Sequence, residues 1–538
     1  MNNDNHNLAC YPFNSLYDVL PHNVKTSPNK IIIHEDDLKI SNQQFKLYVD
    51  QIAKYLLTIN ITANDKVILI MTNCWQYIAN VFAINKIGAV AVPVNNFFKT
   101  DELAYVINNS EAKIAFISNS FLADTKDLII KTNLQKIIWV DGCTLENERN
   151  LDYNKIFQNN LLDENDKNIS SGTNSSINYI NKTILILYTS GTTGKPKGAK
   201  ISAKNIFSNC EGAKALMRAS AKQVRMICYL PMFHAFTLTA TIILPIYTNG
   251  RVIIIRSIKS KNDFKKLLKI LLFQRCRYFV GIPDIYSAMS RAKLPWYFHW
   301  FHSVKGFISG AAPLSDEINK RFSAAFLRGK LLQGYGITEC SPVVSCNSVE
   351  NNRFGSVGRA LNSYQIKIVN EENMDALGTG EIGEICVKGD CVMGGYYNNE
   401  EETQKAIIDG WFKTGDIGYL DVDNYLFIVD RKKDLIINKG MNIYPREIEE
   451  ILYTHEKIKS CAVIGAPDSD NSNEVPIAYI ELHDGQELNE STVREFLKPH
   501  LAAFKIPRRV YFTTIPRNST GKILKRELRK QYLESKTK

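Results

Sequence analysis

The sequence predicts an α/β protein: a large N-terminal domain of helix-covered, mostly parallel sheets plus a small β subdomain, then a small α+β C-terminal domain. Three observations predict this class. Short β-branched runs alternate with helical patterns through the first two-thirds of the chain, which is typical of βαβ units. From about residue 355, short strands and glycine turns replace that alternation. A compact segment of mixed pattern then follows a charge cluster at 430–434.

The expected strands of the parallel sheets are short apolar runs rich in valine and isoleucine. They cover 31–34, 66–72, 89–94, 113–118, 136–141, 183–188, 226–230, 251–256, 278–281 and 304–309. The expected helices between them cover 74–87, 101–110, 202–217, 261–273, 283–291 and 315–327. Ser315, followed by Asp316 and Glu317, is a strong helix start, because a hydroxyl caps the free N–H groups and acids favour the positive end.

The remaining elements define the boundaries. An Asn- and Ser-rich stretch at 163–181 predicts a surface loop, and 425–429 predicts a strand before the charge cluster. Beyond the cluster we expect helices at 445–454 and 491–498, strands at 462–465 and 477–482, and a basic helix around 522–530. We place the domain boundary between Lys432 and Lys433, which gives domains 1–432 and 433–538. A chain of 538 residues is long enough for several cores.

Composition excludes several classes of protein. With 45% hydrophobic and 22% charged residues, the chain is typical of globular proteins. Its net charge of +11 suits anionic ligands, but the bases are scattered, and no basic face with interleaved aromatics indicates nucleic-acid binding. The 11 cysteines lack zinc-site spacing, which favours a reduced cytoplasmic setting. The most apolar stretch, 238–255, predicts a buried helix, a turn and a strand, so membrane contact would be peripheral, at the inner membrane.

One loop carries a clear chemical signal. Residues 188–198 read YTSGTTGKPKG and follow a buried apolar run. Glycines permit close backbone approach, hydroxyls and N–H groups donate to phosphate oxygens, and lysines neutralise charge. The common loop GxxxxGK[ST] is absent, because position 189 is threonine and Pro196 follows the lysine. We therefore expect a nucleotide phosphate site that differs from that of P-loop kinases and ATPases.

Five further motifs follow that loop in order. They are SGAAP at 309–313, YGITE at 335–339, WFKTGD at 411–416, DRKKDLIINKGMNIYPREIE at 430–449 and NSTGK at 518–522. Each alone is compatible with an ordinary turn. Six motifs in fixed order indicate a single extended site.

This set of motifs resembles the adenylate-forming superfamily, which includes acyl-CoA synthetases, peptide-synthetase adenylation domains and firefly-type luciferases. The stretches NVFAINKIGAVAVPVN, LPMFHAF, VMGGYYNNEEET and IVDRKKDLIINKGMNIYPREIEE look most like bacterial long-chain fatty-acid–CoA ligases. The resemblance covers essentially the whole chain and implies two parallel sheets in the first domain and a mobile second domain. It implies ATP, Mg²⁺ and coenzyme A as ligands: a carboxylate attacks ATP to give acyl-AMP, and coenzyme A then displaces AMP.

The resemblance also implies the site residues. Lys522 would bridge the carboxylate and the α-phosphate, Thr338 and Glu339 would hold the α-phosphate and Mg²⁺, and His234 would lie near the acyl carboxylate. The residues expected to bind ATP or AMP are Thr189, Ser190, Gly191, Thr192, Thr193, Gly194, Lys195, Lys197, Gly310, Ala311, Ala312, Pro313, Gly334, Tyr335, Gly336, Thr338, Asp416 and Arg431. Ala311 departs from the family pattern, in which a second glycine is common.

The second half-reaction would use another group of residues. The resemblance implies that Lys433 is the hinge of the C-terminal domain and that Lys439 and Gly440 line the path of coenzyme A. The bases Lys525, Arg526, Arg529 and Lys530 are compatible with phosphate contacts or with a solvated helix face.

The identity of the acid depends on the segment after His234, which is apolar and contains no acidic residue. Peptide-synthetase domains usually place Asp there, and an unpaired buried ammonium would be very costly, so amino acids are disfavoured. We expect an alkyl chain in a tunnel formed by Phe236, Leu238, Gly281 and Ile282. An aryl acid, a carrier protein as the acceptor, a catalytically silent nucleotide or acyl binder, and a homodimer remain open.

Overall fold

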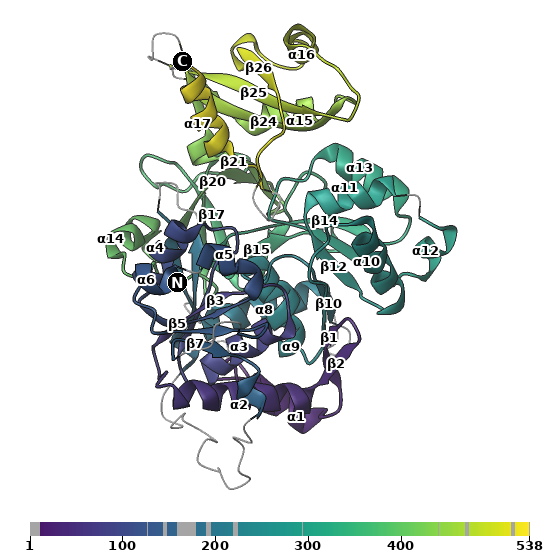
Figure 1. Ribbon diagram of the computed structural model, residues 1–538. Coiled ribbons are helices and arrows are strands. Elements are labelled where there is room, and N and C mark those ends of the chain that lie inside the picture. Colours follow the sequence, from purple (N-terminus) through teal and green to yellow (C-terminus); the bar gives the residue numbers. More distant parts are fainter. Residues whose placement is uncertain are drawn as a thin grey trace, which may run out of the picture.

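Three sheets organise the chain before residue 362 in the computed structural model, and the C-terminal lobe lies above them (Figure 1). The structure describes residues 11–125, 127–143, 148–158, 179–189, 195–218, 224–292, 294–438, 441–468, 473–517 and 522–536. The alternation of strands and helices read from the sequence is confirmed, as is the α/β class.

The largest sheet has seven strands in the order β7-β6-β5-β3-β4-β8-β9. Its strands are β3 (Lys66–Ile70), β4 (Val90–Pro93), β5 (Ala112–Ile117), β6 (Lys136–Trp139), β7 (Asn150–Asp152), β8 (Thr183–Thr189) and β9 (Lys197–Ser202). All neighbours are parallel except β8 and β9, which form an antiparallel pair. The two ends of the glycine-rich motif therefore lie in paired strands, where Tyr188 is opposite Gly198 and Thr189 is opposite Lys197.

A second sheet, of four strands, has the order β10-β11-β1-β2. It consists of β1 (Ile31–Glu35), β2 (Leu38–Ser41), β10 (Arg225–Cys228) and β11 (Arg251–Ile254). The third sheet has the order β12-β13-β14-β15-β16 and consists of β12 (Tyr278–Gly281), β13 (Gly306–Ser309), β14 (Lys330–Gly336), β15 (Val343–Cys346) and β16 (Arg359–Ala360). Its first three strands are parallel, so their carboxyl ends meet at one edge, and motifs follow two of those ends.

Helices cover these sheets. The longer ones are α2 (Asn42–Thr58), α3 (Trp75–Lys86), α4 (Thr100–Ser110), α8 (Ala203–Met217), α10 (Lys261–Phe273), α11 (Pro283–Arg291) and α13 (Asp316–Ala325). The shorter ones are α1 (Val19–Thr26), α5 (Leu122–Thr125), α6 (Leu128–Lys131), α7 (Lys155–Gln158), α9 (Leu244–Tyr247), α12 (Trp296–Phe301) and the π-helix η5 (Thr237–Ile243). The Ser315 hydroxyl accepts a hydrogen bond from the N–H of Ile318, as its sequence context predicts.

The β subdomain is antiparallel, as expected. It consists of β17 (Tyr364–Val369), β18 (Gly383–Gly389), β19 (Ile407–Ile408), β20 (Trp411–Leu420) and β21 (Leu426–Arg431), with α14 (Glu400–Ala406) beside it. A 3-10 turn, Lys432–Asp434, leads into the C-terminal lobe at the proposed boundary. That lobe contains β22 (Ile436–Asn438), β23 (Met441–Ile443), α15 (Pro445–Leu452), β24 (Ile458–Pro467), β25 (Glu474–Leu482), α16 (Glu490–Leu497), β26 (Arg509–Phe512) and α17 (Lys525–Lys536).

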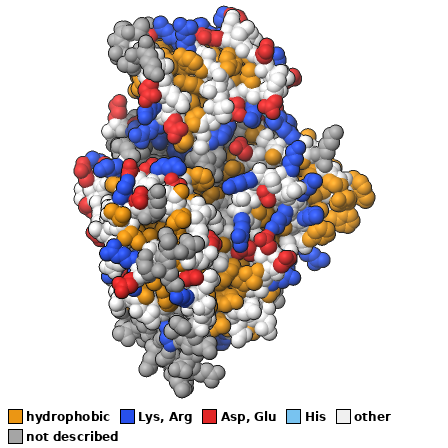
Figure 2. Space-filling view, in the orientation of Figure 1, with side chains coloured by type: hydrophobic (Ala, Val, Ile, Leu, Met, Phe, Trp, Pro, Cys, Tyr) orange, Lys and Arg blue, Asp and Glu red, His pale blue; other side chains and the backbone are white. Residues whose placement is uncertain are grey.

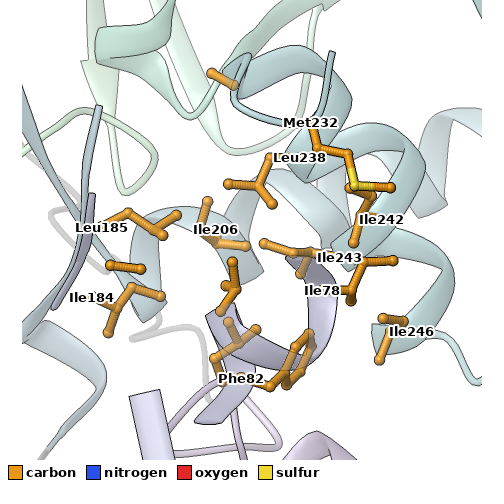
Figure 3. Close-up of a cluster of buried hydrophobic side chains, with 14 of the residues drawn as sticks. Ile78, Phe82, Ile184, Leu185, Ile206, Met232, Leu238, Ile242, Ile243 and Ile246 are labelled. Carbon is orange, nitrogen blue, oxygen red and sulfur yellow. The ribbon is translucent and has the colours of Figure 1, made fainter. Parts of the chain in front are cut away.

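The principal core lies between α3, β8, α8 and η5. Figure 3 shows Ile78 and Phe82 of α3 facing Leu185 of β8, Ile206 of α8 and Ile242 of η5. The expected order of a buried helix, a turn and a strand in 238–255 is confirmed by η5, α9 and β11. Among the described helices, none is both long and apolar enough to cross a bilayer.

Candidate active site

A cavity of about 690 Å³ lies where β8, β14, β20 and β21 meet the turn before α17. We call the part of its wall that is formed by the motif residues the polar end, and the part that is formed by apolar side chains the apolar end. The predicted residues on its wall are Thr189, Lys197, His234, Phe236, Gly310, Ala311, Gly334, Tyr335, Gly336, Thr338, Glu339, Asp416, Arg431, Lys433 and Lys522. Residues separated by more than 300 positions in sequence are therefore brought to one place.

Asp416 lines the polar end of the cavity, and only 4% of it is exposed. The Tyr335 hydroxyl donates to Oδ2 of Asp416 at 2.6 Å, and Nε of Arg431 lies 3.3 Å from Oδ1. The carboxylate raises the pKa of Arg431, while burial and the same carboxylate raise the pKa of Tyr335 well above its usual range. An ionised carboxylate has lone pairs left for further donors, such as vicinal sugar hydroxyls.

Glu339 faces the phosphate loop. Its Oε1 accepts hydrogen bonds from the hydroxyls of Thr189 and Tyr396, each at 3.2 Å. Burial, followed by the charge of Glu339, raises the pKa of Tyr396. A carboxylate beside small hydroxyls, with polyphosphate oxygens available from a nucleotide, fits the ligand set that Mg²⁺ prefers.

Two titratable groups face each other across the cavity. Burial, and to a smaller extent the ammonium of Lys522, lowers the pKa of His234 to about 4. Nδ1 of His234 accepts from the N–H of Phe236 at 3.3 Å, so the neutral ring carries its proton on Nε2. Burial and the charges of Arg431 and Lys433 lower the pKa of Lys522 to about 7. Lys522 precedes α17, which begins at Lys525, so it lies outside the basic helix in which the sequence placed it.

The lysines of the phosphate loop have protein partners. Lys197 forms an ion pair with Glu402 and lies over the ring of Tyr396, with 5.5 Å between Nζ and the ring centroid. Lys195 lies over the ring of Tyr105 at 5.3 Å and does not line the cavity. Ser190, Gly191, Thr192, Thr193 and Gly194 fall outside the described residues.

The SGAAP motif closes another side of the polar end. Ala311 has φ of +66°, a left-handed conformation that favours glycine, so the departure from the family's glycine is accommodated with backbone strain. A Cβ at Gly310 would lie 3.0 Å from Cζ of Phe236, which explains the glycine there. Ala312 and Pro313 line a second cavity that also contacts Ala311, Tyr335, Asp416, Arg431 and Lys522, so the two cavities adjoin at these residues.

The apolar end differs from the predicted tunnel. Phe236 lines it, but Leu238 is 1% exposed and points into the core beside Met232 and Ile242 (Figure 3). At Gly281 a Cβ would lie 2.8 Å from Ile285, and Ile282 lines the second cavity. The walls are instead Ala213, Leu216, Met217, Met226, Ala240, Leu244, Val280, Ile308, Val343, Cys346 and Leu361. Leu238 was assigned wrongly because on η5 it faces away from Ala240.

Residues of the second half-reaction are described only in part. Lys433 lies in the 3-10 turn between β21 and β22, whereas Lys439 and Gly440 fall outside the described residues. The C-terminal bases form ion pairs: Lys525 with Glu449 at 2.8 Å, Arg529 with Glu474, and Lys530 with Glu534 at 3.7 Å.

The sequence did not single out several residues of the polar end. Tyr396 and Glu402 come from the VMGGYYNNEEET stretch, which had been used only for the resemblance. Glu384 is 2% exposed, accepts from the N–H of Gly415 at 3.3 Å and pairs with Lys432 at 3.1 Å. Strand β18 reads GEICVKG, with three apolar residues between Glu384 and Lys388, so no local pattern marked Glu384 as a site residue.

Comparisons with known proteins agree with this geometry. Residues 20–397 match the AMP-binding enzyme family, and residues 447–522 match the AMP-binding enzyme C-terminal domain. The chain therefore belongs to the AMP-binding enzyme family, and the resemblance drawn from its motifs is confirmed.

Individual relatives span nearly the whole chain. A long-chain-fatty-acid–CoA ligase of Bacillus subtilis (strain 168) is 31% identical over 547 residues, which is 97% of this chain and 96% of that protein. A 4-coumarate–CoA ligase 2 of Solanum tuberosum is 30% identical over 490 residues, 89% of this chain and 86% of that protein. The solved structure of ATP-bound MatB from Rhodopseudomonas palustris has a TM-score of 0.82 and 27% identity, covering 96% of this chain and 99% of that chain.

Proposed function

We propose that this protein is an AMP-forming acid–CoA ligase that activates a carboxylic acid with an uncharged, mainly aliphatic tail. A single observation carries the proposal: one cavity joins a polar end, with Glu339, Asp416, Arg431 and Lys522, to an apolar end lined by aliphatic and methionine side chains. An acyl-adenylate has this division, with a polar nucleotide at one end and an acyl tail at the other.

The polar end supplies what the first step needs. Attack of a carboxylate on an α-phosphate brings two anions together, so fixed positive charge lowers the barrier. We assign that charge to Lys522 and Arg431, and sugar binding to Asp416, whose hydrogen bond and ion pair fix its orientation. Thr338 and Glu339 would hold Mg²⁺, which would neutralise phosphate charge when bound.

His234 would position the acid. Because burial lowers its pKa to about 4, the ring is neutral at physiological pH and does not compete with Lys522 for the carboxylate by charge. With Nδ1 accepting from the backbone of Phe236, Nε2–H remains as a donor toward a carboxylate oxygen. This gives the acid one donor at the junction of the polar and apolar ends.

Coenzyme A as the acceptor is supported by the names of the Bacillus and Solanum relatives. We assign the change between half-reactions to rotation at Lys433, where a short turn joins the two lobes. Lys439 and Gly440 would then approach the path of the thiol.

The apolar end favours an alkyl tail. Among its described wall residues Leu216, Met217 and Met226 are flexible or branched aliphatic groups, which adapt to a chain. The described walls of that end carry no carboxylate to pair with an α-ammonium and no cation to pair with a second carboxylate. The name of the Bacillus relative gives a fatty acid as its substrate, which agrees with an alkyl tail. The name of the Solanum relative gives an aryl acid, which is the alternative substrate class.

The test is a panel of acids assayed for pyrophosphate release and for thioester formation. Octanoate and palmitate, 4-coumarate and benzoate, and phenylalanine would each be supplied with ATP and Mg²⁺, with and without coenzyme A. We expect the highest kcat/KM with an alkanoate and a thioester only with coenzyme A, and the Asp416→Ala variant serves as the inactive control. A preference for 4-coumarate would overturn the alkyl assignment, and release of pyrophosphate that needs no acid would overturn the ligase.

A further inference from the structure

A cluster of exposed aromatic side chains protrudes from one side of the first domain. Trp296, Tyr297, Trp300 and Phe301 of α12 are 73%, 45%, 61% and 67% exposed, and Leu327, after α13, is 80% exposed. We call these five residues the aromatic tip. Figure 2 shows apolar side chains gathered on the protruding right edge, where Figure 1 places α12. Large contiguous apolar surface on a globular protein usually marks a binding surface.

Buried aromatic residues beneath α12 fix the orientation of the aromatic tip. Phe298, on the opposite face of α12, is 1% exposed and packs edge-on against Phe326 with 6.1 Å between ring centroids. Phe326 in turn stacks on Phe322 at 4.3 Å. Because this inner aromatic layer holds the helix, the tryptophans on the outer face cannot turn inward without exposing Phe298. The tip is therefore a built feature of the fold.

Positively charged side chains lie on one side of the aromatic tip. The Arg328 guanidinium lies 5.2 Å from the centroid of the Trp300 ring and donates to the Trp300 carbonyl at 2.8 Å. Backbone hydrogen bonds join Lys305 to Arg277 at 2.7 Å and Lys330 to Lys305 at 2.9 Å, so these cations line the starts of β12, β13 and β14. Glu350 lies near the same edge, because its charge acts on Tyr278 of β12. The four cations outnumber this acid, so the net charge of the group is positive. No Asp or Glu occurs between Asp284 and Asp316 or between Glu317 and Glu339.

We propose that the aromatic tip docks the protein on the surface of an anionic lipid bilayer. Tryptophan and tyrosine favour the headgroup level of a bilayer, where an apolar ring and a polar N–H or O–H are both satisfied. Lysine and arginine beside them are attracted to anionic headgroups. A protruding tip with a cationic base inserts into a fluid interface, whereas a protein partner would have to supply a matching apolar groove. This surface is separate from the nucleotide cavity and does not depend on the proposed reaction.

The test uses the full chain and vesicles of two compositions. The wild-type protein would be co-sedimented with vesicles of phosphatidylcholine alone and of phosphatidylcholine mixed with phosphatidylglycerol. We expect binding to the anionic vesicles that weakens with added salt and falls by about tenfold or more in the Trp296→Ser/Trp300→Ser/Phe301→Ser variant. Brominated lipids should quench the tryptophan fluorescence of the wild type but not that of this variant.

Controls separate docking from a general loss of structure. The Ile130→Ser/Val422→Ser variant removes two other exposed apolar side chains, 85% and 84% exposed, and should bind vesicles as the wild type does. Both variants should bind ATP and unfold at the wild-type temperature. Absence of vesicle binding, or equal binding by the triple variant, would overturn the proposal. So would a dimer that the triple substitution dissociates in sedimentation velocity while no vesicles are bound.

Discussion

Replacing Lys522 with arginine separates the charge of this side chain from its ability to lose a proton. Burial, Arg431 and Lys433 lower the pKa of Lys522 to about 7, although Asp416 and Asp434 act in the opposite direction. The cationic fraction of the free enzyme is then about one half at pH 7, about one-tenth at pH 8 and about one-hundredth at pH 9. An arginine at this position stays charged over that whole range.

The assay is acid-dependent incorporation of labelled pyrophosphate into ATP without coenzyme A, because it isolates the first half-reaction. Since kcat/KM reports the free enzyme, its value for ATP should fall about tenfold per pH unit above pH 7 in the wild type. The Lys522→Arg variant should have a lower kcat/KM for ATP than the wild type, but this value should stay constant from pH 7 to 9. Titration of ATP itself affects both proteins equally. Lys525→Arg is the matched control, because Glu449 and Asp430 raise the pKa of Lys525 and its substitution should leave the falling limb unchanged. A falling limb in Lys522→Arg, or a level wild-type profile, would refute the role assigned to this ammonium.

Three further predictions concern the core, the acyl end and the hinge. Leu238→Ala should lower the free energy of unfolding by about 2–5 kcal/mol in denaturant titrations, because Leu238 lies in the core and is 1% exposed. The KM for the acid should stay unchanged. A large rise in KM without loss of stability would contradict this placement. Ala240→Phe should reduce kcat/KM for long alkanoates far more than for acetate, because residue 240 lines the apolar end, and equal losses would count against it. Lys433→Pro should keep pyrophosphate exchange but abolish thioester formation in the coupled assay, because proline restricts the backbone of the turn between the lobes. A normal second half-reaction would contradict the assignment of Lys433 as the hinge.

The sequence predicted what depends on local pattern. The β-branched runs and the cap at Ser315 correspond to real elements, because side-chain period and capping act over a few residues. The helix α2 was missed although Ser41 and Gln44 form a capping box and Phe45, Val49 and Ile52 recur at helical spacing. The sequence therefore did contain a signal for α2. The outward face of the helix, which is rich in Gln, Lys and Tyr, obscured that signal.

The rest depended on tertiary contacts. Leu238 and Ala240 differ by two positions on η5, and only the packing of this helix decides which of them meets the core and which the cavity. Lys522 and His234 are brought together by the docking of two lobes, which no local pattern encodes. The pairing of Lys197 with Glu402 likewise joins segments 205 positions apart.

The central claim is that one cavity holds a nucleotide at its polar end and an acyl tail at its apolar end. Binding of acyl sulfamoyl adenosines, stable mimics of the acyl-adenylate, measured by isothermal titration calorimetry from acetyl to octanoyl tests it most directly. Each buried CH₂ contributes about 0.8 kcal/mol, so the dissociation constant should fall about fourfold per added carbon until the tail reaches the end of the cavity. Equal dissociation constants for the acetyl and octanoyl compounds would show that the tail stays in water and would contradict the account.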